Sequence, residues 1–385
     1  MRLRYLLLLA AVLTSPAWAA FPVAEPNAVL ISNSLFDRDP SVATDGQGNS
    51  VVVWTRFALP HPEVVARLFD PQGKPLGGLL LVNSNGSLPT VAMNARGNFV
   101  VAWTDGTPPK PGAGHPLRVQ LFAPGGAKLG RTTQLNTPVE AETSSPVIGI
   151  DQNGGFAVNW SSLSGVYLRR FDSKGGPLGP QALIDANGSE SSLAMLPDGS
   201  FTLVWHAADL LGRSYGADGV PIGADFKINQ AAATRSQNLT VAATQDGGFV
   251  AAWDVCDTQT CAVRARRFDA EARPLTGELA VSPADGRNNE RPIVAAEDAR
   301  GYFAVSWQSC LQDCRVSTQL YSPDSSPAPH LSTVTVGPDV TAPVIAASPA
   351  GFVVAFSSSA CSHLVPGCHN TTPRGLYLWR FDFPQ

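Results

Sequence analysis

The chain has 385 residues, only 15% of them charged, and its formal net charge is −4 at pH 7. A mildly acidic chain lacks the basic surface that nucleic acids and anionic membranes attract, so we expect neither as the main partner. The chain also contains 35 glycines and 32 prolines, and so many turn-forming residues at low charge favour an all-β protein of short strands.

The first residues have the pattern of a secretory signal peptide. Two arginines precede a short apolar run at residues 5–13, and the sequence Ala-Trp-Ala at residues 17–19 provides small residues at a cleavage site. The apolar run is too short to span a bilayer, and no later stretch approaches the roughly 18 apolar residues that a membrane helix needs. We therefore predict a signal peptide at residues 1–19, a secreted or periplasmic location and no transmembrane segment.

The rest of the chain repeats one unit. The first copy reads PSVATDGQGNSVVVW at residues 40–54, EVVARLFDPQGKPLG at residues 63–77 and GLLLVN at residues 78–83. Each copy has an aromatic anchor at the end of its second strand, at intervals of 45 to 57 residues: Trp54, Trp103, Trp160, Trp205, Trp253, Trp307 and Phe356. A period of this length, built from short strands between Gly- and Asp-rich turns, indicates the blades of a β-propeller.

Each unit divides into four antiparallel strands, A to D, with strand A innermost. We predict one propeller domain at residues 20–385, with seven blades at about 40–83, 89–136, 146–185, 191–229, 239–282, 292–336 and 343–385. The last unit ends after strand C, and residues 27–33 (NAVLISN) are similar to a strand D. This N-terminal strand is therefore expected to complete the last blade and close the ring, which leaves no open edge at the seam.

The repeat resembles that of secreted bacterial β-propeller repeat proteins. Their units are similar to A-x-D-x-x-G-N-F-V-V-x-W, then R-F-D-x-x-G-x-P-L-G, then V-N, and the resemblance covers about residues 27–385. It implies the fold but no specific function, because the repeated residues are turn and packing positions. Sialidase-type propellers with S-x-D-x-G-x-x-W boxes are a weaker match, since Asp45 lies nine residues before Trp54 and the Arg-Ile-Pro signature is absent.

The two ends of a propeller differ in their connections. A–B and C–D turns share one end, which we call the turn face, and B–C and D–A connections share the other, the loop face. The turns are nearly uniform here, whereas the B–C loops vary from 161–165 to 357–374. Variable loops on a fixed scaffold indicate a recognition face, although loop length also drifts neutrally on an exposed surface.

Six cysteines form three close pairs, each in a B–C loop of blades 5, 6 or 7: Cys256 and Cys261, Cys310 and Cys314, Cys361 and Cys368. In an exported chain an even count indicates disulfides. Such clips would stabilise their loops or make a binding surface more rigid, and a thiolate metal cluster is the remaining alternative. Five of the six histidines also lie in B–C loops, but no metal-ligand spacing connects them, so we expect neither a metal nor a cofactor.

The D–A connections contain most of the charged candidates for ligand binding. The predicted binding residues are Asp37, Arg38, Asp39, Glu140, Glu142, Arg235, Arg287, Asn288, Glu290 and Arg291. A mixed-charge ring at the channel mouth suits a glycan or a protein, while solvated loop charge is the simpler interpretation. No nucleophile elbow, phosphate loop or dinucleotide fingerprint occurs.

Three functional hypotheses follow. The first is a monomeric, exported binding or scaffold module for an unknown protein or glycan. The second is a carbohydrate-active hydrolase or lyase with its site at the channel mouth, which rests on analogy of fold alone. A glycosidase would need two carboxylates about 5–10 Å apart, and Glu140, Glu142 or Asp254 could contribute. The third is a structural part of an envelope assembly.

Overall fold

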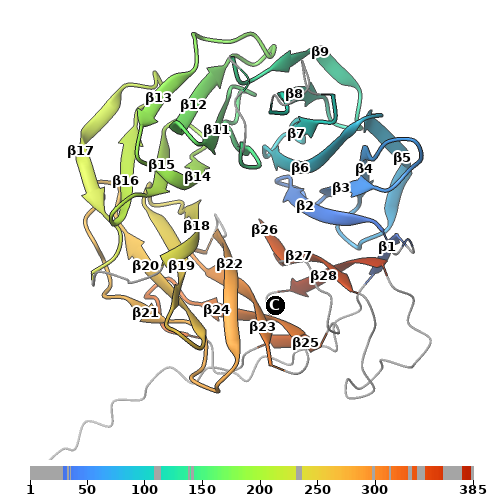
Figure 1. The fold of residues 1–385 in the computed structure, drawn as a ribbon. Helices are drawn as coiled ribbons and strands as arrows, with labels where there is room; N and C mark the ends of the chain where they lie inside the picture. Colours follow the sequence, from blue (N-terminus) through green and yellow to red (C-terminus); the bar gives the residue numbers. More distant parts are fainter. Residues whose placement is uncertain are drawn as a thin grey trace, which may run out of the picture.

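Seven antiparallel four-stranded sheets surround a common axis in the computed structural model of the chain, as predicted (Figure 1). The structure describes residues 29–32, 34, 36–107, 114–137, 139, 143–230, 236–296, 300–311, 314–327, 332–335, 343–358 and 375–382. The expected signal peptide lies outside these residues. Among the residues described, no helix is long and apolar enough to cross a membrane.

Each blade runs from strand A at the axis to strand D at the rim. Blades 1 and 2 contain β2 (Arg38–Thr44), β3 (Ser50–Arg56), β4 (Glu63–Phe69), β5 (Pro75–Asn83), β6 (Gly86–Met93), β7 (Phe99–Asp105), β8 (Leu117–Phe122) and β9 (Lys128–Gln134). Blades 3 and 4 contain β10 (Val147–Ile150), β11 (Phe156–Ser162), β12 (Gly165–Phe171), β13 (Ala182–Asp185), β14 (Ser189–Met195), β15 (Phe201–His206), β16 (Leu210–Tyr215) and β17 (Pro221–Lys227).

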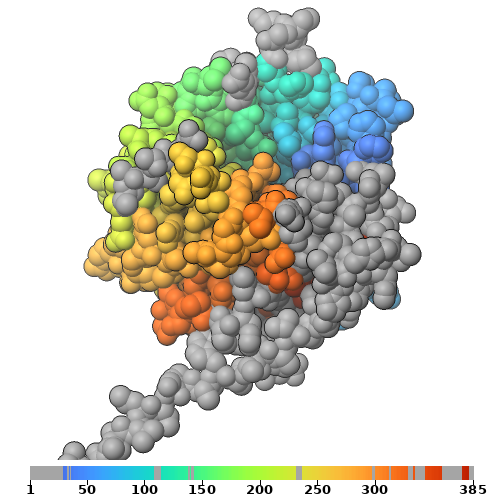
Figure 2. Space-filling model, turned by 60° about the horizontal axis from the view of Figure 1, so that its bottom comes forward, coloured from blue at the N-terminus to red at the C-terminus, as the bar shows by residue number. Residues whose placement is uncertain are grey.

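The remaining blades follow in the same order. Blades 5 and 6 contain β18 (Ser236–Ala243), β19 (Phe249–Cys256), β20 (Cys261–Phe268), β21 (Leu279–Ala280), β22 (Asn288–Ala296), β23 (Phe303–Cys310), β24 (Cys314–Tyr321) and β25 (Ser332–Thr335). Blade 7 contains β26 (Val344–Ser348), β27 (Gly351–Ser358), β28 (Gly375–Asp382) and β1 (Val29–Ser32). The space-filling view shows the blades succeeding one another in chain order, from blue blade 1 to orange blade 6 (Figure 2).

Each aromatic anchor packs against the preceding blade. Trp54 shares a cluster with Ala346 and Leu378 of blade 7, and Trp103 shares one with Val51 of blade 1. The other anchors repeat this arrangement, and the six tryptophans are at most 2% exposed. Burying about 200 Å² of an aromatic ring stabilises the folded state by at most roughly 5 kcal/mol. The anchors are therefore the main source of stability at the interfaces between blades.

The innermost strands are crowded, as the small residue in every strand A predicts. A Cβ atom added to Gly149 would lie only 2.5 Å from Cδ2 of Leu193 and 2.6 Å from Cβ of Met195 in the next blade. The equivalent positions hold Ala43, Ala92, Ala194, Ala242, Ala295 and Ala346. Blades approach one another most closely at the axis, so a larger side chain there would force them apart.

The N-terminal strand closes the ring, as predicted. β1 pairs antiparallel with β28, with Val29 opposite Leu378, and is the outermost strand of blade 7. Ile31 is 6% exposed and belongs to the same cluster as Trp54 of blade 1. The closing strand therefore contributes hydrogen bonds to one blade and apolar contact to the seam between two.

Arginines near the end of strand C tie three blades to the blade that follows. Arg380 of blade 7 donates to the carbonyl oxygens of Asp70 and Pro71 in blade 1, at 2.9 and 2.7 Å. Arg170 and Arg267 reach in the same way from blade 3 to blade 4 and from blade 5 to blade 6. We call these contacts the arginine clasps. The arginine of the R-F-D segment is therefore an interblade tie in these blades.

Closure by β1 can be tested with two neighbouring side chains. Ile31→Ala should lower the free energy of unfolding by about 2–4 kcal/mol, because it opens a cavity in the seam. Leu30→Ala is the matched control, since Leu30 is on the same strand but 37% exposed, and its cost should stay below about 0.5 kcal/mol. Urea denaturation followed by tryptophan fluorescence measures both, and equal costs would contradict the assigned role of β1.

Candidate functional site

On the turn face, aspartates are used to build the turns. Oδ1 of Asp45 accepts hydrogen bonds from the backbone N–H groups of Gln47 and Asn49, both at 2.9 Å. The aspartates of three C–D turns, in blades 1, 3 and 5, make the same pair of contacts. A carboxylate that fixes its own turn in this way is engaged structurally, so the repeated aspartates are poor candidates for chemistry.

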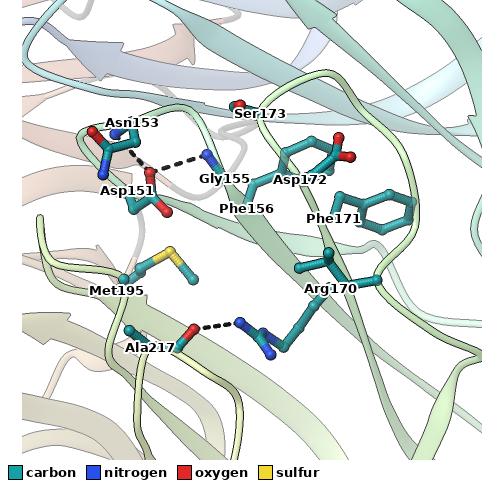
Figure 3. A pocket seen from close by; sticks show the side chains of 12 residues that line it. Asp151, Asn153, Gly155, Phe156, Arg170, Phe171, Asp172, Ser173, Met195 and Ala217 are labelled. Carbon is teal, nitrogen blue, oxygen red and sulfur yellow. Dashed lines mark hydrogen bonds between the residues drawn. The ribbon is translucent and has the colours of Figure 1, made fainter.

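Two cavities open toward the turn face. One of about 240 Å³ lies between blades 3 and 4; the Arg170 clasp to the Ala217 carbonyl crosses it, and Asp151 at its edge accepts N–H bonds from its own turn (Figure 3). The other, of about 520 Å³, lies on the axis and is lined by innermost-strand residues of all seven blades. Asp45 is the one titratable residue in the described lining of the axial cavity, and its carboxylate already fixes a turn.

On the loop face, five innermost strands have a β-bulge of one extra residue beside the anchor tryptophan. The bulged residue has a φ angle between 43° and 54°, a left-handed conformation that costs a non-glycine residue about 1 kcal/mol or more. These residues are Asp39, Leu88, Glu190, Asn238 and Arg291. We call them the mouth bulges, because the innermost strands start at the loop-face mouth of the central channel.

Three mouth bulges are hydrogen-bonded through their backbone to the preceding blade. The three N–H contacts are Leu88 to Oγ1 of Thr55 at 3.0 Å, Asn238 to Oε2 of Glu190 at 2.9 Å and Arg291 to Oδ2 of Asp254 at 3.0 Å. The backbone of each bulge is therefore held by its neighbour, which explains how a strained conformation persists. The side chain is then free to differ from one blade to the next.

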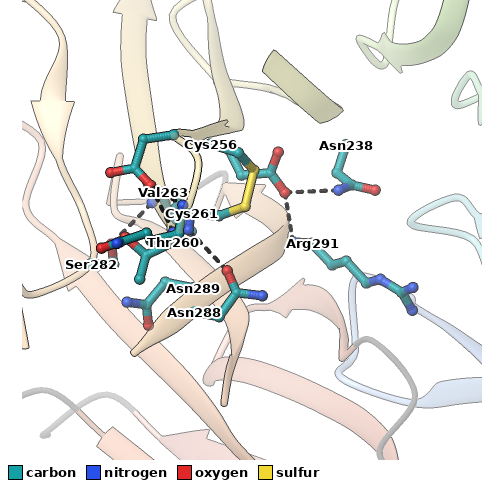
Figure 4. The surroundings of a disulfide bond; sticks show 12 residues. Asn238, Cys256, Thr260, Cys261, Val263, Ser282, Asn288, Asn289 and Arg291 are labelled. Atoms are coloured by element: carbon teal, nitrogen blue, oxygen red, sulfur yellow. Dashed lines mark hydrogen bonds between the residues drawn. A yellow bond between two sulfur atoms is a disulfide. The ribbon is translucent and has the colours of Figure 1, made fainter. Parts of the chain in front are cut away.

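Asp254 lies beneath two of the mouth bulges. It is fully buried, and its Oδ2 accepts hydrogen bonds from Nδ2 of Asn238 at 2.7 Å and from the N–H of Arg291 at 3.0 Å. The dashed lines that end at Asn238 and Arg291 in Figure 4 mark these two contacts. Its Oδ1 is also buried and makes no hydrogen bond with the described residues. Burial raises the pKa of Asp254 and the charges of Glu290 and Glu190 raise it further, against the two hydrogen bonds.

Two of the predicted binding residues are structural. Asp37 is 6% exposed, and its Oδ2 accepts hydrogen bonds from Nε1 of Trp54 at 2.9 Å and from Oγ of Ser32 at 2.6 Å. Arg287 is 8% exposed and donates to the hydroxyl and the carbonyl of Ser309. The Asp37 carboxylate thus joins blade 1 to the closing strand of blade 7, and the Arg287 guanidinium is bonded within blade 6. Neither side chain is available to a ligand.

Four other predicted binding residues do lie at the mouth. Arg38 and Asp39 are in the bulge of blade 1, with Nε of Arg38 3.5 Å from Oδ2 of Asp39, and Glu290 and Arg291 are in the bulge of blade 6. Burial raises the pKa of Asp39, and the Thr55 hydroxyl and Arg38 oppose that shift. Arg38 and Arg291 are exposed.

These residues belong to strands β2 and β22, and not to the D–A connections as predicted. The prediction placed the start of strand A at the proline that follows each bulge, Pro40 or Pro292, because a proline normally marks a strand boundary. In the bulge no ladder N–H is needed, so the strand continues through the proline. Leu88, which precedes Pro89, was missed for the same reason, whereas Asn238 was missed because the predicted unit of blade 5 began at residue 239. Glu140, Glu142 and Arg235 lie outside the described residues.

Two of the three predicted disulfides are present. Cys256 pairs with Cys261 and Cys310 with Cys314, each across the end of a B–C hairpin, while Cys361 and Cys368 lie outside the described residues. The N–H of Cys261 donates to Oδ1 of Asn288 in blade 6 at 2.9 Å, so Asn288, another predicted binding residue, links the clip to the next blade. In the described part of the chain no three His, Cys, Asp or Glu residues form a group suited to a metal ion.

Comparison with known proteins supports the fold and leaves the function open. No family model matches the chain, and no curated protein matches it. Among solved structures, an ulvan lyase of polysaccharide lyase family PL25 has a TM-score of 0.53 at 11% identity, over 90% of this chain and 93% of its own.

Two further solved structures are similar. The Dos1 propeller has a TM-score of 0.52 at 10% identity, over 94% of this chain and 95% of its own. A protein of unknown function from Dyadobacter fermentans has a TM-score of 0.50 at 13% identity, over 80% of this chain and 96% of its own. At such low identity these similarities establish the fold alone.

The state of Asp254 predicts a pH-dependent stability. Because its pKa is raised above the ordinary 3.8, the folded state binds this proton more tightly than the unfolded state, and stability from this group falls as pH rises through the raised pKa. Asp254→Asn removes that loss, so the stability of the variant relative to the wild type should be more favourable at pH 8 than at pH 4. Thermal melts across this range measure the difference.

The matched control for this experiment is Asp198→Asn. The Ser200 hydroxyl and backbone lower the pKa of Asp198, so the ionised form is favoured by folding and its stabilisation is present only above the ordinary pKa. The control variant should therefore lose stability relative to the wild type as pH rises. Parallel pH profiles for the two variants would show that Asp254 is not held as a buried acid.

Proposed function

We propose that this protein is an exported binding module that recognises a glycan or a protein through its loop face, at the mouth bulges. The observation that carries the proposal is a constant backbone with changing side chains. Five blades hold the same bulge at nearly the same φ, yet they present Asp39, Leu88, Glu190, Asn238 and Arg291. Strained positions of this kind concentrate at functional sites, and a rigid scaffold with varied side chains is typical of recognition surfaces.

Export is supported by two lines of argument. The N-terminal sequence has the three parts of a signal peptide, and the two disulfides form readily only in an oxidising compartment. The low net charge and the mixed charges at the mouth favour a polar ligand over a polyanion such as nucleic acid. The chain is therefore proposed to act outside the cytoplasm, in the manner of the secreted propeller proteins that its repeat resembles.

A second candidate function is hydrolysis or elimination of a carbohydrate at the mouth. Asp254 favours it, because a buried carboxyl group with a raised pKa beside other carboxylates is the condition of a general acid. The solved ulvan lyase has a similar fold, which adds only an analogy. A screen of polysaccharides for reducing ends and unsaturated products, with Asp254→Asn as the inactive control, decides between catalysis and binding.

Glycine substitutions can separate the role of the mouth bulges in ligand binding from their effect on the stability of the fold. Arg291→Gly removes the guanidinium and relieves the left-handed backbone, so it should stabilise the fold by up to about 1 kcal/mol and weaken binding at least tenfold. The matched control is Ala272→Gly, because Ala272 has a φ of 59° in a turn-face turn of blade 5. It should stabilise the fold similarly and leave binding unchanged.

Both variants and the wild type are screened on an array of defined oligosaccharides and against proteins secreted by the producing cell. A ligand that binds the wild type and Ala272→Gly but not Arg291→Gly supports the proposal. Identical binding by all three proteins, or no ligand for the folded wild type in either screen, rejects it.

A further inference from the structure

Two phenylalanine rings are exposed side by side on the loop face of blade 1. Phe36 is 62% exposed and Phe57 is 52% exposed, and their ring centroids are 5.4 Å apart with an interplanar angle of 43°. Leu59, near Phe57 in the chain, is 87% exposed. Among the phenylalanines whose burial the structure describes, these two alone are mostly exposed, and large exposed apolar groups that cluster on a soluble protein mark binding sites.

The pair lies just beyond the end of the β2–β3 ladder. Arg38 stands opposite Thr55 in that ladder, and Phe36 and Phe57 each lie two residues beyond this pair in the chain. The N–H of Phe57 donates to Oδ1 of Asp37 at 3.4 Å, the same carboxylate that holds Trp54 and the closing strand. The seam of the propeller therefore holds the backbone of Phe57, and the ring of Phe36 lies beside the ring of Phe57.

Polar groups border the rings on the chain. Arg38, two residues after Phe36, has a side chain that is 61% exposed, and Asp39 follows it in the mouth bulge. On the other strand, Arg56 precedes Phe57 and forms an ion pair with Glu63, with 38% and 20% of their side chains exposed. Charged groups of both signs thus lie close to the two rings in the chain, and Leu88 of blade 2, which is 40% exposed, is held against Thr55 two residues before Phe57.

This composition fits a sugar ring better than a protein. The centre of a protein interface is depleted of charge and surrounded by further apolar contacts over several hundred Å², whereas here charged residues lie within two positions of each ring in the chain. A pyranose has a C–H face that packs on an aromatic ring and hydroxyl groups around its edge that bond to arginine and carboxylate. Two exposed rings with charged residues close by in the chain suit such a unit.

We propose that Phe36 and Phe57 form a subsite that stacks a neutral hexopyranose unit of a glycan, with the exposed guanidinium of Arg38 bonding its hydroxyl groups. The inference rests on the proposed function, which it makes more specific: the ligand is a carbohydrate, and it extends from the mouth over blade 1. Neither residue is part of a blade interior, so the subsite can be altered without disturbing the fold.

The test uses the full chain and soluble neutral oligosaccharides of glucose, mannose and galactose as probes. Saturation-transfer NMR should show transfer to the pyranose C–H protons in the wild type, and affinity should fall about threefold to tenfold in Phe36→Ala and in Phe57→Ala. Phe57→Trp keeps an aromatic face and should retain binding. Leu163→Ala is the control, because Leu163 is 72% exposed in the B–C turn of blade 3, and it should change nothing.

Three results would overturn the subsite. They are the absence of saturation transfer from every neutral oligosaccharide, unchanged affinity in both alanine variants, and loss of binding in Phe57→Trp equal to that in Phe57→Ala. If the screens of the proposed function yield a protein ligand that both alanine variants lose, the rings are a protein contact and the carbohydrate assignment is wrong while the binding function stands. If Arg291→Gly abolishes oligosaccharide binding and the alanine variants do not, recognition is confined to the mouth bulges.

Discussion

The structure depends on the contact between each aromatic anchor and the blade before it. A tryptophan at the end of strand B is covered only when a preceding blade exists, so an open row of blades would leave one indole exposed. In this chain that indole is Trp54, and blade 7 covers it. Blade 7 is itself completed by β1, and Asp37 joins Trp54 to Ser32 at the end of β1. The first strand of the fold thus supplies both a sheet edge and the partner that closes the last interface.

The same anchors help to explain why the loop face and the turn face of the propeller differ. Beside five of the tryptophans the inner strand gains one residue, and the local twist directs that residue to the channel mouth. Each left-handed residue lowers the stability of the fold by about 1 kcal/mol or more. Burial of the anchor in the same blade stabilises the fold by several kcal/mol and can offset this strain. The turn face differs, because the aspartates of its turns are hydrogen-bonded to their own backbone. The clasp arginines there are bonded to the next blade. On the loop face, Arg38 and Arg291 remain exposed beside their bulges.

The sequence was sufficient for the features that local pattern determines. The spacing of the repeat predicts the number of blades, the anchors and the closing strand, because each copy shows where its strands begin and end. It also predicts two disulfides, because a short hairpin loop brings the cysteines at its two ends together. The bulges did not follow, because Pro40, Pro89 and Pro292 look like strand starts and the slip in register depends on contacts with the neighbouring blade. Asp37 and Arg291 looked alike in sequence, as charged residues before strand A. Burial separates them, and burial is a property of the assembled ring.

Aromatic pairing gives the clearest contrast between what the fold uses and what it leaves for a ligand. Inside the blades, an aromatic residue at the start of strand B stacks on one at the end of strand C, as in Phe99 with Phe122 at 4.8 Å and Phe303 with Tyr321 at 4.6 Å. These pairs are buried by the neighbouring blade. Phe36 and Phe57 also form a ring pair, but they lie beyond the ends of β2 and β3, and both rings are more than half exposed. An apolar surface that the fold has positioned and not buried can gain free energy only from a partner, and the charged residues that flank both rings in the chain favour a partner that is apolar on one face and polar at its edge.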